Sequence, residues 1–266
     1  MIAAALLLHP LAPLGLGFTV HASTAVGIVA LAVLYVWRAR KGPAAGPTTG
    51  QRAAFASGLA VLFLSLNGPL HDLSDTYLFT AHMIQHLVLT VVVTPLLIAG
   101  TPAWMLRPAL EVPWVYALAK RVTAAPAAFA IFNVTLIFWH LPPLYNLAMA
   151  NHPVHILQHL CFLVSSTIMW WPLMSTMPEL PRLSYPKQML YSIAMALPMS
   201  LIAIVLTYAD TTLYPAYVSA PRIWGITPLE DQMYGGLLMW LPGGMIFFGV
   251  ASVKFFAWAR ASGEKF

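Results

Sequence analysis

The residues of this chain with the clearest chemical potential are its nine histidines, several of which are paired. His82 and His86 are four residues apart, and so are His155 and His159. Residues at this spacing project from one face of a helix, with Cβ atoms about 5–6 Å apart. Each pair can therefore offer two imidazole nitrogens to one ion. Two such helices together can fill the roughly three or four ligand positions that a copper or zinc ion requires.

Other polar residues are expected to join these pairs. Gln85 and Gln158 each precede the second histidine of a pair, and a metal-bound imidazole needs a hydrogen-bond partner for its other ring nitrogen. We therefore expect both glutamines to support the site. Asp231 is expected beside the histidines, with an N-terminal cap of the last span as the alternative role. The candidate metal ligands are His71, His82, His86, His140, His155, His159 and Asp231.

Three histidines are interpreted differently. A single histidine in a membrane protein is more often a hydrogen-bonded packing or interface residue than a ligand. We expect this structural role for His9, His21 and His152.

The elements that position these residues must be membrane-spanning helices. Of the 266 residues, 60% are hydrophobic and only 8% are charged, whereas a soluble domain has about 25% charged residues. Because each membrane span takes about 20 apolar residues, we expect the whole chain to form one all-α bundle, a single transmembrane domain over 1–266. Seven spans are expected, near 18–37, 53–69, 79–99, 126–142, 154–174, 187–208 and 232–256. Pro95, Pro198 and Pro242 lie inside spans and predict kinks.

The basic residues predict the orientation of these spans. Twelve of the 13 Lys and Arg residues follow spans 1, 3, 5 and 7, and Arg222 is the exception. Short cytoplasmic loops retain basic residues, so the N-terminus is expected outside and the C-terminus in the cytoplasm. All nine histidines then fall in the outer half of the protein. Because the basic residues form short clusters between apolar runs, they do not indicate a nucleic-acid partner.

Two connecting segments carry further expectations. Residues 1–16 are apolar but lack the basic start of a signal peptide, and we interpret them as a retained interfacial segment. The segment 209–230 is the longest outer connection and is expected to cover the outer face as a lid.

Several separated motifs resemble the CtaG family of membrane proteins, which assemble caa-type cytochrome c oxidase. The resemblance runs from about residue 60 to 250. The motifs that carry it are His82-Met-Ile-Gln-His86, Pro95-Leu-Leu-Ile-Ala-Gly-Thr-Pro102, Trp139-His140-Leu-Pro-Pro-Leu-Tyr145, His155-Ile-Leu-Gln-His159, Trp170-Trp171-Pro172 and Asp231-Gln-Met-Tyr-Gly-Gly-Leu-Leu-Met-Trp240.

This resemblance implies a seven-span protein of the bacterial plasma membrane that takes part in oxidase assembly and delivers copper. The expected partners are cytochrome c oxidase subunits, a periplasmic copper donor and membrane lipid, with the metal site on the periplasmic side. The oligomeric state is left open, a homodimer included.

Two other functions compete with copper delivery. Histidines on facing helices can ligate haem axially, so a haem-binding redox protein is the main alternative. A metallohydrolase is disfavoured, because Met83 stands where His-Glu-x-x-His carries its glutamate. We therefore expect no enzymatic activity.

Overall fold

Helices make up all of the regular structure in residues 18–263, the part of the chain that this computed structural model describes. Residues 1–16, expected to be interfacial, and His9 lie outside the described residues. The α-helices are α2 (Ala22–Lys41), α3 (Thr49–Ser65), α4 (Pro69–Thr76), α5 (Phe79–Leu87), α6 (Thr94–Gly100), α7 (Ala103–Leu110), α8 (Pro113–Val122), α9 (Ala125–His140), α10 (Pro142–Ala150), α11 (His152–Met174), α12 (Tyr185–Thr207), α13 (Pro215–Val218), α14 (Pro228–Leu238) and α15 (Gly244–Ala261).

The number of membrane crossings depends on two bent helix pairs. Five helical stretches are long and apolar enough to cross a membrane alone, and the number rises to seven if each bent pair counts as one span. These pairs are α3 with α4, bent by 45°, and α8 with α9, bent by 75°. The all-helical membrane architecture is confirmed, while the expected count of seven spans is reached only with both bent pairs.

Local sequence signals explain where several helices begin. Thr48 and Gln51 form a capping box at the start of α3, and Thr227 and Glu230 form another at α14. These reciprocal bonds satisfy backbone N–H groups that a helix start leaves unpaired. The side chain of Asn151 accepts a hydrogen bond from the Val154 N–H and so begins α11 one residue before its first histidine.

Two of the predicted proline sites coincide with π-helical turns. The segment η1 (Val88–Val93) connects α5 to α6 just before Pro95, and η2 (Met239–Gly243) contains Pro242. A π turn has an i→i+5 bonding pattern, and the backbone N–H of Thr94 correspondingly donates to the Leu89 carbonyl. Pro198, in contrast, lies inside α12 without a break in the helix.

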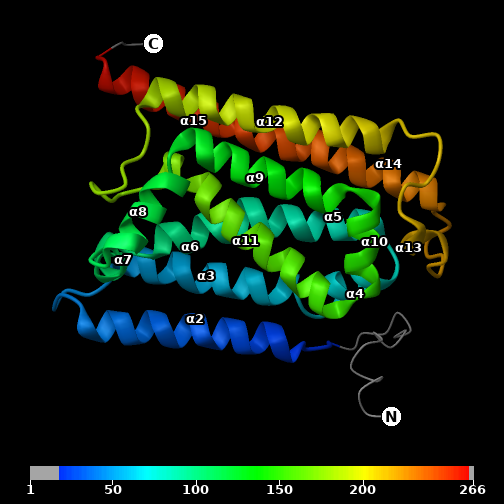
Figure 1. The fold of residues 1–266 in the computed structure, drawn as a ribbon, viewed down its shortest axis with the longest axis horizontal. Helices are drawn as coiled ribbons and strands as arrows, with labels where there is room; N and C mark the ends of the chain where they lie inside the picture. Colours follow the sequence, from blue (N-terminus) through cyan, green and yellow to red (C-terminus); the bar gives the residue numbers. More distant parts are fainter. Residues whose placement is uncertain (1–17, 264–266) are drawn as a thin grey trace.

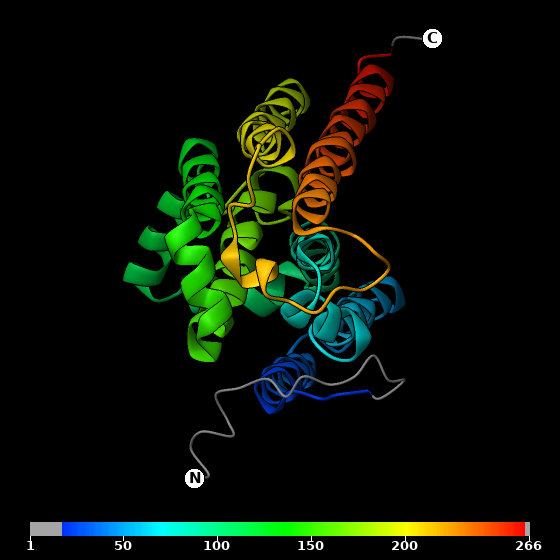
Figure 2. The same cartoon turned by 90° about the vertical axis from the view of Figure 1, so that its right-hand side faces the viewer.

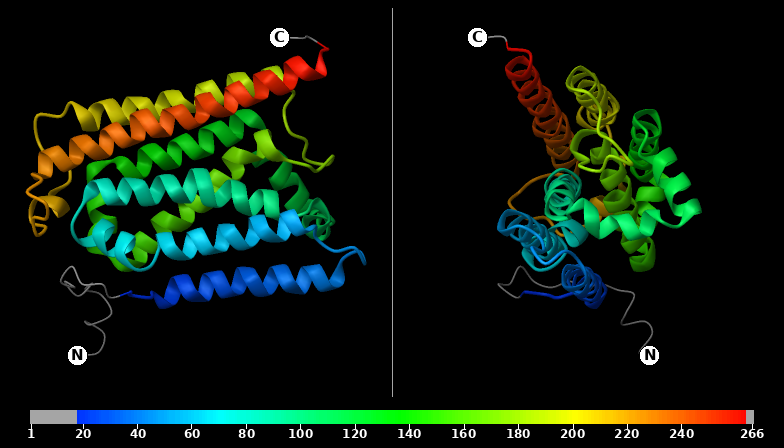
Figure 3. Two further views of the ribbon diagram at one scale, coloured as in Figure 1. Left: turned by 180° about the vertical axis from the view of Figure 1, so that it is seen from behind. Right: turned by 90° about the vertical axis from the view of Figure 1, so that its left-hand side faces the viewer.

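The long helices run side by side, and different short helices close the two ends of the bundle (Figure 1). The short helices α4, α10 and α13 lie at one end, which faces the viewer in Figure 2. The helices α7 and α8 lie at the opposite end, where α15 also ends (Figure 3). The α4–α10–α13 end contains the starts of α5 and α11, and therefore both histidine pairs.

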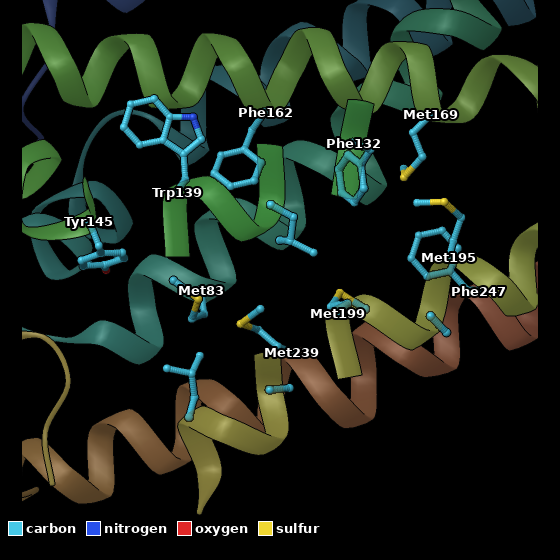
Figure 4. Close-up of a cluster of buried hydrophobic side chains, with 14 of the residues drawn as sticks. Met83, Phe132, Trp139, Tyr145, Phe162, Met169, Met195, Met199, Met239 and Phe247 are labelled. Carbon is cyan, nitrogen blue, oxygen red and sulfur yellow. The ribbon is translucent and has the colours of Figure 1, made fainter. Parts of the chain in front are cut away.

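The packing differs between the edge of the bundle and its centre. The helix α2 lies along one edge (Figure 3) and has no buried residue, as is typical of a helix that faces lipid. The main core contains buried residues of α5, α9, α10, α11, α12, α13, η2 and α15, many of them aromatic residues and methionines. Figure 4 shows several of these methionines directed into the space between the helices.

Candidate metal centre

The two histidine pairs meet inside the bundle. His82 on α5 stacks on His155 of α11, with ring centroids 5.3 Å apart. The His86 and His159 rings of the same two helices are 5.4 Å apart. All four side chains are buried, and one donor atom each of His82, His155 and His159 lies within 4.8 Å of the other two. We call these three residues the three-histidine centre.

Imidazole nitrogens of this centre are available to a ligand. The Nε2 atoms of His155 and His159 are buried and have no hydrogen-bond partner. Leaving a buried polar atom unpaired costs about 1–3 kcal/mol. Nitrogens bound to one ion at about 2.0 Å lie roughly 3.3 Å apart, so small rotations of these rings would bring them to coordinating positions. The centre therefore fits a metal ion held by neutral imidazoles.

A buried carboxylate, Asp75, links two of the histidines. Its Oδ2 atom lies 3.4 Å from His155 Nδ1 and 3.4 Å from His71 Nε2. A carboxylate that accepts the Nδ1–H of an imidazole leaves Nε2 as the free lone pair, which is the usual arrangement behind a metal-bound histidine. Asp75 thus prepares His155 to bind an ion.

Asp75 is not among the site residues predicted from the sequence. Its spacing of four residues from His71 was the available signal, because it places both side chains on one face of α4. His71, expected to be a ligand, instead has its two ring nitrogens facing Asp75 and Gln85.

The two glutamines expected to support the site have different surroundings. The Gln85 amide nitrogen lies 2.6 Å from the Ser65 carbonyl and 3.1 Å from His71 Nδ1, and its oxygen accepts from the Ser74 hydroxyl at 3.2 Å. Both amide atoms of Gln158 are buried without a hydrogen-bond partner. Only Gln85 therefore has the expected contact with a histidine.

A tyrosine from the predicted lid reaches the histidines. Tyr217 on α13, within the segment 209–230, is buried and places its hydroxyl 3.2 Å from His82 Nδ1. Burial raises the pKa of Tyr217, and the nearby Asp75 adds to the effect. The phenol therefore stays protonated at neutral pH and donates to the Ser74 carbonyl at 2.8 Å. The Nδ1–H of His82 then donates to this hydroxyl, so His82 Nε2 carries the lone pair, and this nitrogen lies 2.9 Å from His86 Nε2.

Asp231 has a structural role other than the two predicted from the sequence. The backbone N–H groups of Phe79 and Thr80 donate to Asp231 Oδ2 and Oδ1 at 2.6 and 3.0 Å. The carboxylate of α14 therefore caps the start of α5 from a neighbouring helix, with one backbone N–H bound to each oxygen. The alternative, a cap of its own helix, is also incorrect, since Thr227 and Glu230 cap α14.

Two histidines expected to be packing residues lie next to the site. The His21 ring, before α2, lies 4.3 Å from the His71 ring and 6.1 Å from the His152 ring. These three histidines line a cavity of about 20 Å³ together with His155 and His159. His21 and His152 are partly exposed, so a row of imidazoles leads from the surface to the buried centre.

His140 lies apart from the three-histidine centre. Its Nδ1 atom contacts the Leu136 carbonyl of its own helix at 2.7 Å, and its ring lies 6.3 Å from Phe162. His86 and His140 line a different small cavity, beside Phe162. The seven expected ligands are therefore not brought to one point.

Comparisons with known proteins give one match. No curated protein and no solved structure matches the chain, and the one match is to a protein family. Residues 30–261 match the family described as cytochrome c oxidase caa3 assembly factor, Caa3_CtaG. This range contains nearly all of the described helices, so the chain belongs to the caa3 cytochrome c oxidase assembly factor family.

Proposed function

We propose that this assembly factor binds copper at His82, His155 and His159 and passes it to a subunit of cytochrome c oxidase. The observation that carries the proposal is the convergence of three buried imidazole nitrogens within 4.8 Å of one another. Neutral nitrogen ligands suit copper or zinc, and the family's role in oxidase assembly favours copper.

The distribution of charge supports a periplasmic position for the proposed site. The histidines lie at the α4–α10–α13 end, whereas Lys120 and Arg121 end α8 at the opposite end. Basic residues mark the cytoplasmic side, so the proposed copper site faces the periplasm. A periplasmic donor would meet His21 and His152 first.

A second opening leads to the same histidines from the side of the bundle. A cavity of about 260 Å³ between α2, α3 and α11 includes His159 and otherwise mainly apolar residues such as Ile28 and Leu62. An acceptor helix within the membrane has a route to His159 here. The proposed transfer would then run from imidazoles at the surface to an acceptor beside α2.

The test combines metal binding with oxidase assembly. Purified protein loaded with copper is expected to hold about one ion at this centre. Replacing His155 and His159 by Ala should remove that ion and lower oxidase activity in cells that carry the variant. Leu157→Ala is the control, because Leu157 lies on the same helix with 52% of its surface exposed.

Two outcomes would contradict this function. Retention of both copper and oxidase activity in the double variant would exclude the three-histidine centre from copper delivery. A Soret band in the visible spectrum would instead support the haem alternative. The two small cavities beside the histidines, about 20 Å³ each, offer no room for a haem macrocycle, and the cavity of about 260 Å³ has only one histidine, His159, among its described lining residues.

A further inference from the structure

A second cavity beside His86 has the composition of a different metal site. Its volume is about 20 Å³, and it is lined by His86, His140, Met83, Met199 and Met239 among other residues. One water molecule needs at least about 10–15 Å³ by the same kind of measure. The space thus accepts one ion or one water molecule and nothing larger.

Both histidines of this cavity have a nitrogen without a partner. His140 Nδ1 donates to the Leu136 carbonyl at 2.7 Å, which makes Nε2 the lone-pair nitrogen, and Nε2 is buried and unpaired. A backbone carbonyl behind one nitrogen is a common support for a metal-bound imidazole. His86 places Nε2 2.9 Å from His82 Nε2, and its Nδ1 is likewise buried and unpaired.

The methionines come from three different parts of the fold. Met83 belongs to α5, Met199 to α12 and Met239 to the π turn η2. Each is at most 4% exposed, and Figure 4 shows all three directed toward the same part of the core. Methionine often serves only as packing in such a core, but packing alone does not explain two unpaired imidazole nitrogens beside the thioethers.

The backbone around the cavity is unusual as well. Thr90 of η1 and Met239 of η2 both line it, so each of the two π turns in the described residues borders this space. Single π turns inside α-helices occur frequently at functional sites. The Thr90 carbonyl accepts the Trp170 indole N–H at 2.8 Å, which fixes the wall of the cavity.

We propose that His86 Nδ1, His140 Nε2 and the thioethers of Met83, Met199 and Met239 form a second metal site, selective for a soft monovalent cation such as Cu(I). Imidazole and thioether are the ligand types that Cu(I) accepts. Among the described residues, no carboxylate or thiol lines the cavity, so a buried dication would keep its full charge uncompensated, at a high desolvation cost.

His86 joins this second site to the three-histidine centre. Its two nitrogens face His82 and the methionine cavity respectively, so one ring serves both positions. This second site goes beyond the proposed function, because it makes no use of the ligand nitrogens of His155 or His159.

The test measures the neighbours of bound copper directly. Protein labelled with selenomethionine is loaded with Cu(I) alone under reducing conditions, and X-ray absorption is recorded at the copper edge. A selenium neighbour is expected in the unsubstituted protein. It should persist when His155 and His159 are replaced by Ala, which separates this site from the proposed delivery centre.

Substitutions identify which methionines are involved. Met83→Leu, Met199→Leu and Met239→Leu together should remove the selenium signal and about one equivalent of Cu(I). Met169→Leu is the buried control and Met245→Leu the exposed one, at 0% and 69% exposure. Absence of selenium around copper in the unsubstituted protein overturns the proposal, since water would then fill the cavity. Loss of the signal in either control also overturns it.

Discussion

The two His-x-x-x-His motifs are alike in sequence and different in their surroundings. His82-Met-Ile-Gln-His86 and His155-Ile-Leu-Gln-His159 each open a helix at the same end of the bundle. On α5, Gln85 and His82 are held by hydrogen bonds to other elements. On α11, both amide atoms of Gln158 and the Nε2 atoms of both histidines are buried without partners.

This difference suggests a division of roles between the two helices. Hydrogen-bond contacts with α3, α4 and α13 hold the Gln85 and His82 side chains of the α5 motif in position. The α11 motif supplies nitrogens whose hydrogen-bonding capacity is unused, so it gains most from a bound ion. At the three-histidine centre, the α5 motif thus contributes one histidine held by a hydrogen bond, and the α11 motif contributes two histidines with unpaired nitrogens.

The largest expected effect comes from removing either histidine pair. His82→Ala with His86→Ala and His155→Ala with His159→Ala should both abolish copper binding at the three-histidine centre. The α5 variant should also lose about 1–3 kcal/mol of unfolding free energy, because His82 is hydrogen-bonded to Tyr217. Copper titration and thermal unfolding in detergent measure both effects. Equal stability losses in the two variants would show that the helices do not differ in this way.

Asp75→Asn should lower copper affinity by about 10–100-fold, the usual effect of losing the partner behind a metal-bound histidine. The substitution weakens the contact with His155 Nδ1 that leaves Nε2 free for the ion. Asp72→Asn on the same helix is the matched control, since Asp72 contacts Thr19 near the surface. Isothermal titration with copper gives both affinities. Identical values for the two variants would remove Asp75 from the site.

Gln85→Leu and Gln158→Leu test the comparison between the motifs most simply. Gln85→Leu should cost about 1–3 kcal/mol, because it removes the contacts of the Gln85 amide with the Ser65 carbonyl and His71 Nδ1. Gln158→Leu should be neutral or stabilising, since it removes buried amide atoms that make no hydrogen bond. Thermal unfolding in detergent measures the stability of each variant relative to the unsubstituted protein. A larger loss of unfolding free energy for Gln158→Leu than for Gln85→Leu would show that Gln158, and not Gln85, makes the stabilising hydrogen bonds.

Asp231→Ala should cost about 0.5–2 kcal/mol, the typical value of a helix cap, and leave copper affinity unchanged. The reason is that its oxygens accept the Phe79 and Thr80 N–H groups at the start of α5. The exposed Asp210→Ala is the control. A fall in copper affinity comparable to that of Asp75→Asn would make Asp231 part of the centre after all.

The membrane helices and the meeting of the histidines were predictable from sequence. Apolar length identifies spans without knowledge of tertiary contacts, and a spacing of four residues places His82 with His86, and His155 with His159, on common helix faces. Within each pair the rings lie 4.2 and 4.4 Å apart, as the spacing predicted, and the packing of α5 against α11 brings the two pairs together.

The support of the site was less predictable, because it depends on contacts between distant segments. Asp231 caps a helix that begins 152 residues earlier in the chain, and Tyr217 contacts a histidine 135 residues away. No local pattern encodes such pairings. Gln158 shows that a matching local sequence does not guarantee matching contacts. Like Gln85, it precedes the second histidine of its motif, but its amide atoms have no hydrogen-bond partner.

The most direct measurement counts the histidines around one bound copper ion. Pulsed electron paramagnetic resonance of protein loaded with one equivalent of Cu(II), with ¹⁵N-labelled histidine, reports each coordinated imidazole. Three imidazoles are expected, from His82, His155 and His159, and each single replacement by Ala should remove one. A spectrum without imidazole nitrogen, or one unchanged by substitutions on either α5 or α11, would contradict a copper site shared between these two helices.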